Sequence, residues 1–261
     1  MLAFFQTIIY TPLYNALIFL TYISPWSDIG IAIVLLTLVV RGILFPFAHS
    51  SSKTQAKMRE LEPVFKKIKE DHKDDQEAQA RKMMELYKEH GLNPATGCLT
   101  LIVQLPIIIG LYWVFKDIHV RPDTIATIAD SAQTIASSLL NTDIVYSFTP
   151  VPAFIQTHFL GIVDMTGKSI TLALLAGVTQ YIQSRLSMPG KTTLQSTGSL
   201  KDDMTQNLKF QMRYIFPFMV ALLAYSISAA VALYWVTSNT FTVIHELFVR
   251  RKAKETINLT A

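Results

Sequence analysis

Long apolar runs alternate with polar segments along this chain of 261 residues. About 20 consecutive apolar residues are enough to cross the hydrocarbon core of a bilayer. The five predicted transmembrane helices are 24–48, 95–116, 168–187, 209–227 and 229–250. The last two come from one run that is too long for a single crossing, so a turn is expected near 226–229. The pattern predicts an all-α membrane protein.

The first 23 residues are apolar but are interrupted by polar positions and by a proline. Gln6 and Asn15 break the apolar run, and Pro12 would kink or break a spanning helix. The segment 1–23 is therefore predicted to be an amphipathic helix at the membrane interface. A sixth transmembrane helix over the same residues remains the alternative.

The segment 49–94 has the opposite character, with ten Lys or Arg and nine Asp or Glu. Its apolar residues recur at helical spacing, and the polar run 71–76 interrupts them. This predicts two amphipathic helices that fold back as an antiparallel cytoplasmic hairpin. Met58, Met83 and Met84 would offer it adaptable apolar contacts. The alternative is that the charges form no more than a solvated face.

Basic residues predict the orientation of the chain in the membrane. The segments 48–97, 185–213 and 246–261 hold 10, 5 and 4 Lys or Arg, whereas 116–168 holds three. Positive charge marks cytoplasmic loops, which places the N-terminus outside and the C-terminus in the cytoplasm. The remaining predicted segments are an extracytoplasmic loop 117–167, a cytoplasmic linker 188–208 and a basic cytoplasmic tail 251–261.

Arg41 lies inside the predicted transmembrane helix 24–48 and keeps its charge at any relevant pH. A charge in the bilayer centre costs about 2.5–3.5 kcal/mol on insertion scales. Thr37 shares its helical face, and Gln104, Gln180 and Gln183 place amides in other runs. No Asp or Glu lies within the apolar interior of these runs, which favours a water-filled cavity for a transient anionic guest. Snorkelling to the headgroups, or packing against backbone carbonyls, remains the alternative.

The chain shows no signature of an enzyme or of a bound cofactor. Its six histidines are scattered without metal-ligand spacing, and HExxH and GxSxG are absent. Its single cysteine excludes an intrachain disulfide. We therefore expect no catalytic residue, no metal and no cofactor.

Several segments, in order along the chain, carry a resemblance to a known family. They are 33–47, Lys57-Met58-Arg59, Leu86-Tyr87-Lys88, Asn93-Pro94, Gly97-Cys98, Gln104-Leu105-Pro106, 177–183, Leu233-Tyr234-Trp235 and Ser238-Asn239. The chain resembles the YidC/Oxa/Alb family of membrane protein insertases, in the short bacterial form without a large periplasmic domain. The resemblance covers most of the sequence, and no single short motif carries it.

The resemblance implies five membrane helices around a hydrophilic groove that opens to the cytoplasm and to lipid. The groove residues it implies are Arg41, Thr37, Gln104, Leu105, Ile108, Tyr234 and Trp235. Trp235 departs from the tyrosine of many bacterial members and loses its hydroxyl. Gln180 and Gln183 join this set from the analysis of polar positions above.

The function that this resemblance implies is insertion of hydrophobic segments of nascent proteins into the bacterial inner membrane. The expected partners are nascent membrane proteins and membrane lipids. The Sec translocon and the ribosome are further candidates, and no DNA partner is expected. The alternatives are a small-molecule transporter or channel, which predicts inverted repeats that the sequence lacks, and a chaperone that folds membrane proteins without inserting them.

Overall fold

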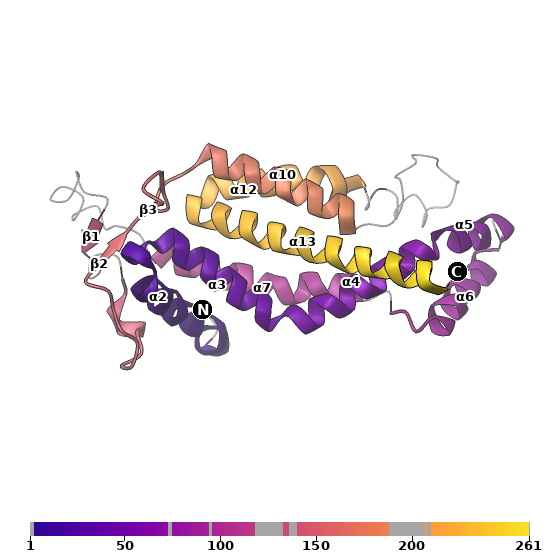
Figure 1. Cartoon of the computed structure of the whole chain (residues 1–261), viewed down its shortest axis with the longest axis horizontal. Helices are drawn as coiled ribbons and strands as arrows, with labels where there is room; N and C mark the ends of the chain where they lie inside the picture. Colours follow the sequence, from indigo (N-terminus) through magenta and orange to yellow (C-terminus); the bar gives the residue numbers. More distant parts are fainter. Residues whose placement is uncertain are drawn as a thin grey trace.

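The chain folds, in a computed structural model, into an elongated helical bundle (Figure 1). The structure describes residues 3–72, 75–93, 96–117, 133–135, 140–187, 207 and 210–260. The helices and helical turns are α1 (Ala3–Phe5), η1 (Gln6–Tyr10), α2 (Thr11–Ile23), η2 (Pro25–Ser27), α3 (Ile29–Ile43), α4 (Phe45–Glu60), α5 (Glu62–Asp71), α6 (Gln76–Glu89), α7 (Thr96–Asp117), η3 (Thr142–Ile144), α10 (Ile170–Ser187), η4 (Gln211–Ile215), α12 (Phe216–Ile227) and α13 (Ala229–Thr260). The predicted helical class agrees with this architecture.

Helix α13 runs along the middle of the bundle, with α10 and α12 on one side and α3 and α7 on the other (Figure 1). Its first turns, 229–235, are buried throughout. Four of these seven residues are Ala or Val, which are small enough to let several helices approach α13 closely. Helices α5 and α6 lie at one end of the molecule, the hairpin end. The segment 140–169 and the starts of α3, α10 and α13 lie at the other, the loop end.

The predicted transmembrane helix 24–48 does not form one straight helix. Helix α3 ends at Ile43, and α4 leaves it at an angle of 67°. Pro46 lies in the first turn of α4, where its ring has no N–H to donate and would clash with the carbonyl four residues earlier. The predicted span 24–48 is therefore bent in its last turn, just beyond Arg41.

Prolines also explain two π-helical turns in the bundle. Turn η1 precedes Pro12 and turn η4 precedes Pro217, and each proline is in the first turn of the α-helix that follows. The wider turn lets the backbone N–H of Thr11 bond to Gln6, five residues earlier, and that of Phe216 bond to Gln211. Because of this adjustment, Pro12 does not break the helix as the sequence suggested.

The continuous helix Ala3–Ile23 is the one straight helix among the described residues that is long and apolar enough to cross a membrane. Its inner face buries Tyr10, Tyr14, Leu17 and Ile18 against α3 and α7. It is thus a packed part of the bundle. That this helix lies at the membrane interface stays a prediction, with a sixth transmembrane helix as the alternative.

The charged segment forms three helices where two were predicted. Leu61 separates α4 from α5, and Pro63 in the first turn of α5 accounts for this break. Helices α5 and α6 then form the antiparallel pair, in which Phe65 and Tyr87 lie with ring centroids 5.1 Å apart. Burial of the Tyr87 phenol raises its pKa above the usual value. Met83 is half-buried, and Met84 is exposed.

The described part of the predicted loop 117–167 contains four short strands. They are β1 (Gln133–Ile135), β2 (Phe154–Gln156), β3 (His158–Phe159) and β4 (Val163–Asp164). They pair as two antiparallel ribbons, β1 with β2 and β3 with β4. The backbone N–H groups of Ala229 and Ala230 bond to the carbonyls of Gly167 and Met165. This segment therefore supplies hydrogen-bond partners to the start of the central helix.

Helices α10 and α12 lie close together at Gly177, which gives a test of the packing. A Cβ atom there would lie 2.9 Å from Ala221 Cβ and 3.3 Å from the Pro217 carbonyl oxygen. Gly177→Ala should therefore lower the free energy of unfolding by about 1–3 kcal/mol, as overpacked cores do. Thermal unfolding in detergent measures this. The matched control is Gly42→Ala, where nothing lies within 4 Å, and an equal loss there would contradict the account.

Candidate functional site

Polar side chains from three helices meet in the interior of the apolar bundle. Arg41 of α3 donates from Nε to Ser238 Oγ of α13 at 3.0 Å, and its Nη2 donates to the same oxygen. Tyr234, one turn before Ser238, accepts a hydrogen bond from Gln104 of α7. Tyr234 and Ser238 are four residues apart on α13 and therefore share a face of that helix. We call Arg41, Gln104, Tyr234 and Ser238 the arginine cluster.

The arginine cluster contains a positive charge and, among the described residues, no carboxylate that pairs with it. Ser238 and Tyr234 are buried, whereas Arg41 and Gln104 are partly exposed. Among the described residues, Arg41 forms no ion pair with a carboxylate. A guanidinium carries five N–H donors, and one serine oxygen occupies only part of that capacity. The cluster therefore presents positive charge and spare donors between three apolar helices.

Thr37 shares the face of Arg41 but keeps its hydroxyl within its own helix. Its Oγ1 donates to the Ile33 carbonyl at 2.7 Å, and the side chain is buried. This backbone bond satisfies the hydroxyl donor locally. Thr37 thus places a small polar side chain one turn from Arg41, and its hydroxyl donor is already used by the backbone.

The two glutamines of α10 are not hydrogen-bonded to the arginine cluster. Gln180 is buried and donates to Ser184 Oγ on its own helix at 3.4 Å. Gln183 is half-buried, and its Oε1 has no hydrogen-bond partner in the described part of the chain. Asn239 of α13 instead makes a polar link to α10, where it donates to Thr179 Oγ1 at 3.3 Å.

The apolar residues of the predicted groove differ in their exposure. On α7, Leu105 is exposed and Ile108 is half-buried next to the core. Trp235 is buried in the core beside Tyr234. A side chain such as Leu105 is therefore open to a guest or to lipid, whereas Trp235 chiefly fills space between helices.

Two polar groupings near the hairpin end were not singled out from the sequence as sites. His49 Nδ1 and His245 Nε2 lie 3.1 Å apart and link α4 to α13. Glu246 is buried and pairs with Arg250, whose Nε lies 3.1 Å from Glu246 Oε1. The histidines are 196 residues apart in sequence, so no local spacing could have indicated the pair.

Ser238 is the functional candidate that the sequence could have revealed. It lies four residues after Tyr234, and residues at this spacing share a helix face. The described residues contain no group of three or more His, Cys, Asp or Glu that could hold a metal ion. Hydrogen bonding and charge are therefore the chemistry that the described arginine cluster offers.

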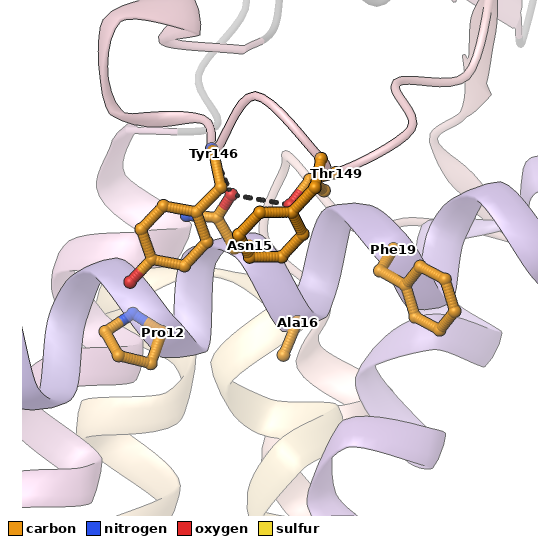
Figure 2. A pocket seen from close by; sticks show the side chains of 7 residues that line it. Pro12, Asn15, Ala16, Phe19, Tyr146 and Thr149 are labelled. Carbon is orange, nitrogen blue, oxygen red and sulfur yellow. Dashed lines mark hydrogen bonds between the residues drawn. The ribbon is translucent and has the colours of Figure 1, made fainter.

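A hollow of about 400 Å³ lies elsewhere, between α2 and the segment 144–149 (Figure 2). Its lining is Pro12, Asn15, Ala16, Phe19, Tyr146, Phe148 and Thr149. Asn15 lies at its base and accepts from the Tyr146 backbone N–H at 2.7 Å and from Thr149 Oγ1 at 3.1 Å. This hollow is distinct from the arginine cluster, and its amide is already hydrogen-bonded.

Comparison with known proteins points to one family. Residues 19–256 match the family model described as 60Kd inner membrane protein. The membrane protein insertase YidC of Jannaschia sp. (strain CCS1) is 32% identical over 232 residues, which are 86% of this chain and 33% of that protein. The protein of the same name from Francisella philomiragia is 29% identical over 257 residues, 98% of this chain and 37% of that protein.

The fold and the arginine cluster define a bundle of apolar helices that encloses a cationic group. The chain belongs to the 60Kd inner membrane protein family. It spans about a third of the length of the curated relatives it matches. The resemblance to insertases noted from the sequence is confirmed at the level of the family.

Removing the Ser238 hydroxyl tests whether it supports Arg41. Ser238→Ala deletes the oxygen that accepts from both Nε and Nη2. Hydrogen bonds to charged groups contribute about 1.5–3 kcal/mol, so the free energy of unfolding in mixed micelles should fall by a similar amount. Ser226→Ala is the control, because that hydroxyl bonds only to Leu222 of its own exposed turn. Equal small effects of both changes would show that Ser238 does not hold the guanidinium.

Proposed function

We propose that this chain is a membrane protein insertase, which moves hydrophobic segments of nascent proteins from the cytoplasm into the lipid bilayer. The observation that carries the proposal is the guanidinium of Arg41, which lies between apolar helices and forms no ion pair with a carboxylate among the described residues. Family membership and the names of the relatives support it. The predicted groove residues keep their proposed roles within this function.

The proposed mechanism uses the arginine cluster as a temporary partner for charge. A substrate approaches from the hairpin end, and its hydrophobic segment slides along the exposed apolar surface of α7 near Leu105. Its short polar tail, when acidic, is drawn to Arg41. Opposite charges 4 Å apart attract by about 4 kcal/mol at an effective dielectric constant of 20. The attraction offsets part of the cost of taking one carboxylate into the bilayer.

Release completes the proposed cycle without any nucleotide. The hydrophobic segment leaves sideways into lipid, driven by roughly 25 cal/mol for each Å² of apolar surface removed from water. Ser238 and Tyr234 keep the cluster in place between substrates, because they hold Arg41 and Gln104 through α13. The cluster therefore binds each substrate weakly and transiently, and it is free again after the substrate leaves.

In the proposed orientation the charged helices α4–α6 and the end of α13 lie in the cytoplasm. The basic segments 48–97, 185–213 and 246–261 support this orientation, because positive charge marks cytoplasmic loops. Nascent membrane proteins and membrane lipids are the proposed partners. The Sec translocon and the ribosome remain candidate partners for the hairpin end and for the tail.

Two rival functions make different predictions. A transporter or channel would produce solute flux in proteoliposomes, and it would leave the hairpin helices without a role. A chaperone that does not insert its clients would crosslink from Ile108 or Tyr234 to a nascent chain only after insertion. Crosslinks from Gln104 to ribosome-bound chains before insertion favour the proposed function over both.

Charge at position 41 is the quantity to change in an insertion assay. Arg41→Ala should slow insertion of a substrate with an acidic outer tail by at least about tenfold, since 1.4 kcal/mol of lost attraction corresponds to that factor. Arg41→Lys, which keeps the charge, should retain more activity. The control is Arg81→Ala on the exposed face of α6, where Arg81 pairs with Glu77. Wild-type insertion by Arg41→Ala would refute charge capture.

A further inference from the structure

Large apolar side chains are exposed at the loop end of the bundle, among them Trp26, Leu160 and Ile162. Trp26 is 75% exposed, Leu160 is 57% exposed and Ile162 is 80% exposed. Exposed apolar groups gathered at one end of a molecule mark contact with a membrane or with another protein. We call these three residues the apolar tip.

The backbone of the apolar tip is held in an unusual conformation. Trp26 has φ of 57° and Leu160 has φ of 52°, both in the left-handed region. Bulky side chains rarely adopt this region, where glycine is favoured. Outliers of this kind persist only where the surroundings enforce them, and they gather at functional positions. The chain keeps a large apolar residue at both turns, although glycine would remove the strain.

One buried carboxylate fixes both turns. Asp28 Oδ1 accepts from the backbone N–H groups of Gly30 and Ile31, at 2.7 Å and 3.1 Å, and so caps α3 two residues after Trp26. Asp28 Oδ2 accepts from the Leu160 N–H at 2.8 Å. Phe159 packs so closely on Gly30 that a Cβ atom there would lie 2.4 Å from its ring. The apolar tip is therefore presented on a fixed base.

The charges around the apolar tip indicate what it contacts. Residues 24–28 and 140–164 contain no Lys or Arg. Their acids are Asp28, which is buried, Asp164, which accepts from Thr166 at 2.8 Å, and the exposed Asp143. Ile170 and Leu174, at the start of α10, are exposed directly beyond this segment. The apolar tip thus continues the outward-facing apolar surface of the helices.

We propose that Trp26, Leu160 and Ile162 insert into the boundary layer between lipid headgroups and acyl chains at the loop end of the bundle. Tryptophan favours this layer because its ring is apolar and its N–H is polar. Apolar groups of interfacial segments enter this boundary by about 5–10 Å. The tip fixes the depth of the loop end in the bilayer. The inference rests on the proposed function only in placing the bundle in a membrane.

Depth-dependent quenching in nanodiscs tests the inference. In a Cys98→Ser background, Trp26→Cys carries an environment-sensitive fluorophore, and Asp143→Cys provides a matched exposed polar site in the same segment. The label at 26 should be quenched several-fold more by lipids with a nitroxide near the headgroup than by aqueous iodide. The label at 143 should show the reverse. Iodide quenching at 26 equal to that at 143 overturns the inference.

Protection of position 26 from both quenchers also overturns the inference, because a protein then covers the tip. A third label, Leu222→Cys on the exposed apolar face of α12, separates this outcome from failure of the proposed function. Lipid quenching at 222 without lipid quenching at 26 overturns only the apolar tip. No lipid quenching at either site shows that the bundle is outside the bilayer, which overturns both proposals.

Asp28 is a positioning residue for the apolar tip. Asp28→Ala should shift the emission of a label at Leu160→Cys to the red and reduce its quenching by shallow nitroxide lipids by at least half, with helix content by circular dichroism unchanged. Asp28→Asn keeps an acceptor for the cap and should restore part of the quenching. If Asp28→Ala leaves the depth at 160 unchanged, the carboxylate does not set it.

Discussion

A guanidinium enclosed by apolar helices needs partners, and Arg41 finds its hydrogen-bond partner on α13. The Ser238 hydroxyl accepts hydrogen bonds from two N–H groups of Arg41. The Tyr234 hydroxyl, one turn away, accepts one from the side-chain amide of Gln104. These contacts align α3, α7 and α13 at one level of the bundle. Because the described contacts add no carboxylate, the charge of Arg41 remains available. The same arrangement is both a structural contact and the proposed site of function.

The sequence indicated most of the helices but few of their irregularities. Apolar runs identified the helical segments, and the chain turns at Ser228, within the range expected for the turn between the last two helices. The 67° bend after α3 and the break at Leu61 depend on where Pro46 and Pro63 lie within each helix. Apolar periodicity does not report such local backbone geometry.

For the site, the sequence indicated which polar residues to consider but not which way their side chains face. Arg41, Gln104 and Tyr234 were singled out from residue type and resemblance, and the structure brings them together with Ser238. Gln180 and Gln183 were included because they are polar residues in an apolar run, but Gln180 bonds within its own helix. Which way a polar side chain faces depends on helix rotation and packing. The roles of all these residues in a groove remain proposals.

The two ends of the bundle differ in charge and in the contacts that hold them together. At the hairpin end, charged helices pack through a few aromatic and aliphatic contacts such as Phe65 with Tyr87. At the loop end, the carboxylate of Asp28 organises a nearly uncharged segment around the start of α3. The arginine cluster lies on the helices that join these ends.

The most direct test of the account supplies Arg41 with a carboxylate of its own. Ser238→Asp places one at the oxygen that Arg41 already contacts, and insertion of a substrate with an acidic tail is measured beside Ser238→Asn. The account predicts that Ser238→Asp folds at least as stably as Ser238→Asn but loses most of its insertion activity, because the internal carboxylate occupies the charge. Full activity of a folded Ser238→Asp protein would contradict the claim that an available cation at this position does the work.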